Sequence, residues 1–175
     1  ETGKELYPIT KTAEGYTFEI DENQNATLIK TDILAETIEI PSEISSYKVK
    51  KLSCVEEAAL VGVSLTGVFE ENNVVKEIII PEGVVETYGP AIANCYNLEK
   101  ITIPGTMTTF DVVRCDNLKE VNIVDGDTIT ESFSFSDCSG LEEIYLPKQI
   151  NKISTNAFAR CYSLKNVKFS KNVYC

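Results

Sequence analysis

The sequence predicts a solenoid, a fold in which units of similar length stack as successive coils. Two observations predict it: a pattern of about 23 residues recurs along most of the chain, and each copy contains a short alternating apolar segment typical of a β-strand. The first apolar residues of these segments are Ile38, Ile78, Ile101, Val121, Ile144 and Val167. Their separations are 40, 23, 20, 23 and 23 residues, so one gap holds a 17-residue insertion and another lacks three residues.

Each copy alternates residues that should face the core with residues that should face solvent. In the central copy, Ile101 and Ile103 are expected to point inward, and Pro104 ends the strand because proline cannot donate to a neighbouring strand. The chain then returns along the other side, where the ring of a residue such as Phe158 fills the space behind the sheet. A single coil cannot bury its own apolar face, so the copies must stack.

The chain divides into three parts. Residues 1–14 carry no pattern and start with Glu-Thr-Gly, which resembles the scar of a secretion vector, so we assign them to a tag remnant or leader. Residues 15–36 predict an N-terminal β-hairpin that caps the first coil. Residues 37–175 hold the repeats, with an insertion at about 53–67. Because the last repeat stops part-way, at Cys175, we expect the sequence to be truncated there.

The insertion carries one local signal. Ser53 and Glu56 have the spacing of a capping box, which predicts a short helix over about residues 54–61. Insertions in solenoids often lie on a functional face, and the alternative is a loop that only covers the sheet edge.

Composition and charge exclude several classes of partner. The net charge of −11 argues against nucleic acid and anionic membrane surfaces. No apolar run approaches the ~20 residues of a spanning helix, so we expect no direct membrane insertion of this part of the chain. Asn25-Ala26-Thr27 is a sequon, which makes Asn25 a candidate glycosylation site. Together with the vector-like start, this sequon favours an extracellular or cell-surface location.

Four of the six cysteines share one repeat column: Cys95, Cys115, Cys138 and Cys161. Side chains in such a ladder run parallel, which disfavours the torsion of about 90° that a disulfide needs, so we predict free, buried thiols. The chain has no Cys-x-x-Cys pair, which disfavours a metal site. Cys54 and Cys175 lie outside the column, and whether they form disulfides stays open.

The chain contains no histidine, which removes the usual general base and most nucleophile arrangements. We therefore predict no catalytic residues, no metal ligands and no cofactor. The segment Asp125-Gly126-Asp127 resembles a calcium loop only superficially, and turn formation explains it.

The columns resemble the BspA-like leucine-rich repeats, whose units read Ala-Phe-x-x-Cys-x-x-Leu-x-x-Ile-x-Ile-Pro. Residues 144–153 and 157–167 carry the match, while Thr87 and Val124 depart from it. The resemblance implies a right-handed leucine-rich repeat solenoid of the α/β class, rich in β-structure, with a parallel sheet along one face. It also implies a surface protein associated with adhesion to host matrix or to other cells.

Candidate binding residues come from the positions between the core residues of each strand. They are Ile79, Lys100, Thr102, Asn122, Tyr145 and Lys168. The function that we expect is non-catalytic protein binding in adhesion or host interaction, with a host matrix or cell-surface protein as partner. The alternative is a structural spacer or homotypic assembly repeat that presents another domain, and a homo-oligomer remains open.

Overall fold

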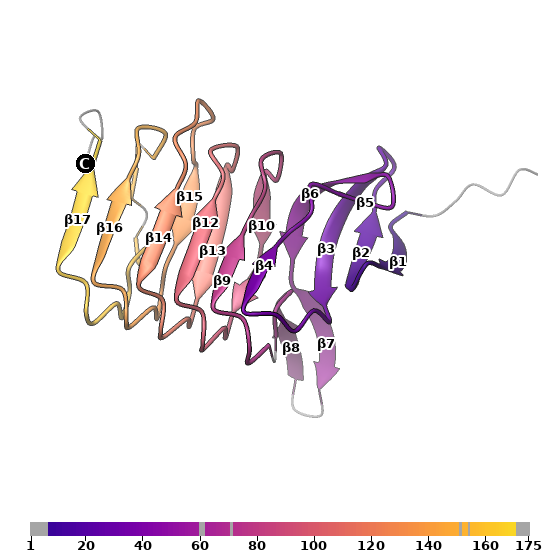
Figure 1. Ribbon diagram of the computed structural model, residues 1–175, viewed down its shortest axis with the longest axis horizontal. Helices are drawn as coiled ribbons and strands as arrows, with labels where there is room; N and C mark the ends of the chain where they lie inside the picture. Colours follow the sequence, from indigo (N-terminus) through magenta and orange to yellow (C-terminus); the bar gives the residue numbers. More distant parts are fainter. Residues whose placement is uncertain (1–6, 60–61, 71, 151, 154, 171–175) are drawn as a thin grey trace, which may run out of the picture.

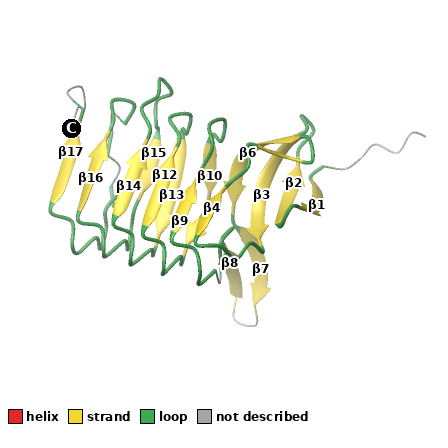
Figure 2. Cartoon of the chain, in the orientation of Figure 1, coloured by secondary structure: helices red, strands yellow, loops and turns green. Residues whose placement is uncertain are grey.

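The computed structural model describes residues 7–59, 62–70, 72–150, 152–153 and 155–170, and they form a solenoid of stacked coils (Figure 1). Every regular element within these ranges is a strand, and none is a helix (Figure 2). The predicted solenoid with parallel sheets is confirmed.

An antiparallel cap covers the N-terminal end of the solenoid. Its strands pair in chain order and are β1 (Ile9–Ala13), β2 (Tyr16–Ile20) and β3 (Asn25–Thr31). The turn between β2 and β3 forms because the Asp21 carboxylate accepts the backbone N–H groups of Asn23 and Asn25, both at 2.9 Å. Strand β1 adds a third strand from the segment in which the sequence showed no pattern.

One side of the solenoid is a row of parallel strands that we call the front sheet. Its strands are β4 (Thr37–Glu39), β9 (Glu77–Ile79), β12 (Lys100–Ile103), β14 (Glu120–Ile123), β16 (Glu143–Leu146) and β17 (Asn166–Phe169). The first four form one hydrogen-bonded sheet and the last two form a separate pair. Equivalent repeat positions lie side by side, since Ile101 is opposite Ile78 on one side and Val121 on the other. The repeat alignment read from the sequence is therefore the structural register.

The opposite side is the back sheet, which joins the cap to the coils because β3 pairs with β6. Its strands are β5 (Glu43–Ile44), β6 (Tyr47–Ser53), β10 (Glu86–Tyr88), β11 (Ile92–Ala93), β13 (Thr109–Val113) and β15 (Ser132–Ser134). The core lies between the two sheets. Phenylalanine rings from successive coils pack against one another behind the front sheet, with centroid separations of 5.7 Å for the stacked pair Phe110 and Phe133 and for the edge-to-face pair Phe133 and Phe158. The predicted role of these rings is confirmed.

The predicted helix over residues 54–61 is wrong. β7 (Val55–Ala59) and β8 (Gly62–Thr66) form an antiparallel hairpin that projects from the solenoid (Figure 1). The capping box is not formed, because Ser53 lies in β6 and its hydroxyl donates to the carbonyl of Cys54 at 3.0 Å. The second half of the insertion is rich in β-branched residues, which favour a strand. Pairing with β8 satisfies the backbone N–H and C=O groups of β7. In the predicted helix, hydrogen bonds within the helix and its cap would have satisfied the same groups.

Candidate binding surface on the front sheet

The front sheet carries all six candidate binding residues on its outer face. Ile79, Lys100 and Thr102 are half-buried, and Asn122, Tyr145 and Lys168 are exposed. Their strand neighbours alternate with them and are buried in the core, for example Ile78, Ile101 and Ile144. The structure therefore brings these residues together on one face, while their role in binding remains a prediction.

The cations of this face are paired with carboxylates of adjacent coils. Lys100 Nζ lies 3.3 Å from a carboxylate oxygen of Glu77 and 3.2 Å from one of Glu120. The hydrogen bond from Lys100 to Glu120 makes the largest contribution to raising the pKa of this ammonium group, and the hydrogen bond to Glu77 raises it further. Lys168 Nζ lies 2.9 Å from the Glu143 carboxylate. Since all these side chains contact water, the pairs hold the coils in register only weakly and can exchange partners.

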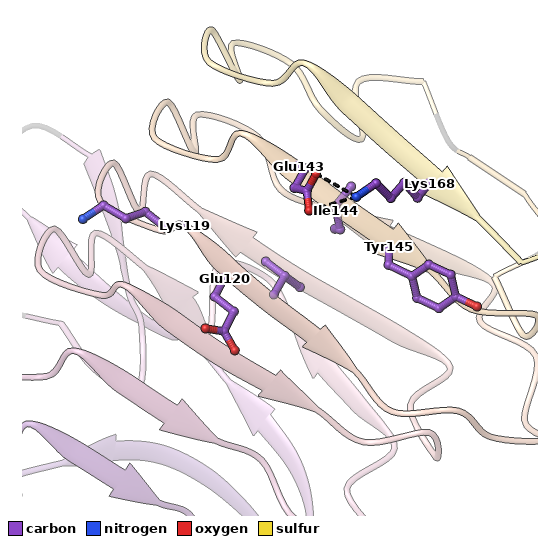
Figure 3. A pocket seen from close by; sticks show the side chains of 7 residues that line it. Lys119, Glu120, Glu143, Ile144, Tyr145 and Lys168 are labelled. Atoms are coloured by element: carbon purple, nitrogen blue, oxygen red, sulfur yellow. Dashed lines mark hydrogen bonds and ion pairs between the residues drawn. The ribbon is translucent and has the colours of Figure 1, made fainter.

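A groove of about 220 Å³ opens between β14 and β16 (Figure 3). Its lining residues are Lys119, Glu120, Val121, Glu143, Ile144, Tyr145 and Lys168. Figure 3 shows charged side chains around the rim, with the ring of Tyr145 beside them. Two of the candidate residues, Tyr145 and Lys168, therefore line the same groove.

The groove exists because the front sheet is interrupted at this step. At the preceding step, the N–H groups of Lys119 and Glu120 both donate to the carbonyl of Glu99, at 2.9 and 3.0 Å. The Lys119 carbonyl should accept the equivalent bonds from Glu142 and Glu143, but neither bond is formed within this described stretch of chain. A side chain replaces part of the missing pairing, since Gln149 Nε2 donates to the Val124 carbonyl at 2.6 Å. Sequence reasoning noted Val124 as a departure but missed Gln149.

Sequence reasoning also missed a column of charges at the edge of the front sheet, which we call the rim column. Each member immediately precedes a front-sheet strand, and the sign of the charge alternates from coil to coil: Glu36, Lys76, Glu99, Lys119, Glu142 and Lys165. Three contacts join neighbouring members: Lys76 to Glu36 at 2.8 Å, Lys119 to Glu99 at 3.6 Å, and Lys165 to Glu142 at 2.9 Å. Aligning the copies by charge as well as by apolarity would have revealed this column.

The cysteine column offers no reactive group on this surface. Cys95, Cys115, Cys138 and Cys161 are buried and free, as predicted. A hydrogen bond with Cys115, together with burial, raises the pKa of Cys138, and burial raises the pKa of Cys161 to about 11. A thiol with a raised pKa is protonated at neutral pH and is a poor nucleophile. In the part of the chain that the structure describes, no three potential metal ligands gather into a cluster.

Two further predictions concern residues away from the front sheet. Asn25 lies at the start of β3 with its side-chain amide donating to both carboxylate oxygens of Asp21, at 3.3 and 3.1 Å. Its glycosylation stays a prediction. The thiol of Cys54 lies close to Gly89, where a side chain would meet it at 2.5 Å, and Cys175 lies outside the described residues.

The succession of coils matches a known repeat family. The model of the BspA-type leucine-rich repeat region, in six copies, matches residues 29–113 and 110–175. The chain belongs to this family. Members of the BspA-type leucine-rich repeat family are generally non-enzymatic repeat scaffolds. No curated protein matches the chain. Within the described residues, no helix is long and apolar enough to cross a membrane.

Solved structures of bacterial leucine-rich repeat proteins share the fold of this BspA-type chain. The leucine-rich repeat protein TpLRR of T. pallidum is 18% identical with a TM-score of 0.68, and the match covers 90% of this chain and 70% of that one. A leucine-rich repeat protein from Bacteroides capillosus is 21% identical with a TM-score of 0.54, covering 92% and 98%. The pneumococcal vaccine antigen PcpA is 15% identical with a TM-score of 0.57, covering 94% and 51%. At these identities the similarity shows the fold alone.

Proposed function

We propose that this chain is a non-catalytic protein-binding module at the cell surface or outside the cell, and that it acts in adhesion or host interaction. The observation that carries the proposal is the exposed Tyr145 ring beside the groove between β14 and β16. A solvent-facing sheet with a groove, an aromatic side chain and paired charges has the composition of a protein-binding surface.

Tyr145 supplies the apolar contact of this surface. Its side chain is 48% exposed on the outer face of a strand whose alternate residues, Ile144 and Leu146, are buried. An aromatic side chain fixed by a strand loses little conformational freedom on binding and contributes a large contact area. Lys168 and Glu143 beside it supply hydrogen-bonding groups that a partner can reach. This arrangement supports binding of a folded protein surface or an extended segment of a protein.

The proposed location rests on two observations. The sequon at Asn25 lies in the cap, away from the front sheet, so a glycan there would leave the binding face open. PcpA, which shares the fold, is a vaccine antigen, a property that fits exposure of such solenoids to the host.

The net charge of −11 bears on the partner, because it disfavours nucleic acid.

A direct binding assay tests this proposal. The chain, kept at ~1 µM in solution, is passed over immobilised matrix proteins and over host cells, and the Tyr145→Ala variant is compared with the wild type. Loss of an aromatic side chain that the partner buries should weaken binding by ~30-fold or more. Tyr162→Ala is the matched control, because this tyrosine is 80% exposed but precedes β17 and lies outside the front-sheet strands. Unchanged binding by Tyr145→Ala and by Lys168→Ala would refute the site.

A further inference from the structure

We propose that the front sheet also binds the front sheet of a second copy of this chain, forming a twofold-symmetric dimer. The inference rests on the proposed function in one respect, namely that this sheet is a binding face, and it names a partner for it. The charges and the shape of this face are complementary to those of a second copy turned by a twofold rotation.

A twofold axis that runs parallel to the strands, between β12 and β14, places the two sheets face to face. This rotation reverses the order of the coils but keeps the strand direction, so every repeat column meets itself in reverse order. The row holds six strands, four in one hydrogen-bonded sheet and two in a separate pair, and the axis divides them into β4, β9 and β12 on one side and β14, β16 and β17 on the other. Such an interface uses the same patch on both copies, as in most symmetric dimers.

The rim column is complementary to itself under this rotation. Read forwards it is acid, base, acid, base, acid, base, and read backwards every acid faces a base. At the centre, Glu99 of one copy faces Lys119 of the second copy, and the same contact occurs again across the axis. Outside it, Lys76 faces Glu142 and Glu36 faces Lys165. All of these side chains are at least 49% exposed, so they can reach a second copy.

The third residues of the six strands, which face outward, are also complementary to those of the second copy. In chain order they are Glu39, Ile79, Thr102, Asn122, Tyr145 and Lys168. Reversal places Glu39 opposite Lys168, Ile79 opposite Tyr145, and Thr102 opposite Asn122. The two apolar residues of the face therefore meet each other, and the groove beside Tyr145 gives the Ile79 side chain of the second copy an apolar floor in Val121 and Ile144.

The third column, formed by the first residue of each strand, contains one unfavourable pair of residues, which meets twice across the axis. Reversal places Lys100 opposite Glu120, which is favourable, but it places Glu77 opposite Glu143. Each of these two carboxylates already has a lysine neighbour in its own chain, Lys100 at 3.3 Å and Lys168 at 2.9 Å. The like charges are therefore compensated within each copy.

The size of the face predicts weak association. Five steps of ~4.8 Å and strands of three or four residues at ~3.3 Å give a face of at most ~24 Å by ~13 Å. This area of ~300 Å² per copy is well below the ~800 Å² of a stable interface. The net charge of −11 on each copy also opposes approach. The dimer should therefore form at high concentration, or where copies are displayed close together on a surface.

Sedimentation equilibrium from ~10 µM to ~1 mM at ~0.15 M salt, where the Debye length is ~8 Å, tests the proposal. The wild type should change from monomer to dimer with concentration. Glu99→Lys and Lys119→Glu each place like charges together twice at the axis, so each variant alone should remain monomeric. An equimolar mixture of the two variants should dimerise again, because both central contacts then join a lysine of one variant to a glutamate of the other.

Dimerisation of the mixture would show that Glu99 and Lys119 act between copies and not only through their ion pair within one chain. Each variant still has two like charges at these positions of its own chain in the mixture, so the ion pair within the chain is not restored. Asp127→Lys and Lys148→Glu are matched controls, since they make the same charge changes in an exposed ion pair outside the front sheet and should leave dimerisation intact. A wild type that stays monomeric at every concentration, or a mixture that stays monomeric, would overturn the dimer. Neither result affects the matrix-binding assay at ~1 µM, where the chain is monomeric, so the two proposals fail independently.

Discussion

The side-chain amide of Asn72 donates to the backbone carbonyl of Ile33 at 2.8 Å. Asn72 occupies the column that holds cysteine in later coils, and Ile33 lies just after the cap. The side-chain carbonyl of Asn72 also accepts the backbone N–H groups of Val74 and Val75, at 3.1 and 3.0 Å. Asn72 is the first member of this column, so no cysteine of an earlier coil lies beneath it. Its side chain instead connects the first full coil to the segment that follows the cap.

Restoring the repeat residue at this position should destabilise the protein. Asn72→Cys leaves the Ile33 carbonyl, the buried N–H of Val75 and the part-buried N–H of Val74 without a partner, which we expect to cost ~1–3 kcal/mol in the free energy of unfolding. Urea denaturation under reducing conditions measures the change. Asn73→Ala is the control, because this neighbouring side chain is exposed and its removal should change stability by less than ~0.5 kcal/mol. Equal stability of the Asn72→Cys variant and the wild type would contradict the role of this contact.

The phenylalanine stack should account for a large part of the stability of the C-terminal coils. Phe133 contacts the rings of Phe110, Phe135 and Phe158 at centroid separations of 5.7, 6.1 and 5.7 Å. Phe133→Ala leaves a cavity in contact with three coils, and we expect a loss of ~3–5 kcal/mol. Thermal and urea unfolding measure it, with the exposed Tyr162→Ala as the control. A loss below ~1 kcal/mol would show that neighbouring coils collapse to fill the space.

Alkaline pH should weaken the fold through Cys161. Burial raises the pKa of this thiol from 9.0 to about 11. Above pH ~9 the thiol of the unfolded chain loses its proton while that of the folded chain keeps it, so the unfolded state is favoured. The stability due to this group is complete below pH ~9 and is lost as the pH rises towards ~11. Urea midpoints between pH 8 and ~10.5 with a reductant should fall less steeply in Cys161→Ala than in the wild type, and parallel slopes would count against this role.

The β7–β8 hairpin should be dispensable for folding. Its two strands pair with each other and with no other strand in the described chain. Replacing residues 55–66 with two glycines should therefore preserve cooperative unfolding and change the free energy of unfolding by less than ~1 kcal/mol. Circular dichroism and urea denaturation test this expectation. Loss of cooperative unfolding would show that the hairpin helps to hold the first coil.

Most of the solenoid could be predicted from the sequence because each coil repeats the same local pattern. The alternation of Ile101 and Ile103 with polar residues predicts both the core and the outer face. The helix prediction failed because Ser53 and Glu56 form a local signal, whereas the strand pairing from Val55 to Thr66 depends on residues further along the chain. The groove could not be predicted, since it arises from backbone hydrogen bonds missing between two coils, and no single repeat shows that loss.

The interruption between β14 and β16 also affects how the solenoid can bend. On the back side the same two coils remain joined, because Phe135 donates its N–H to the Ala157 carbonyl at 2.7 Å and Thr130 donates its N–H to the Gln149 carbonyl at 3.0 Å. At the front, by contrast, the Gln149 side chain bonds the Val124 carbonyl in place of backbone pairing between β14 and β16. We therefore expect the solenoid to bend at this joint more readily than at the fully paired steps, and such bending would widen or narrow the front groove. Bending at this joint would change the curvature of the front sheet beside Tyr145.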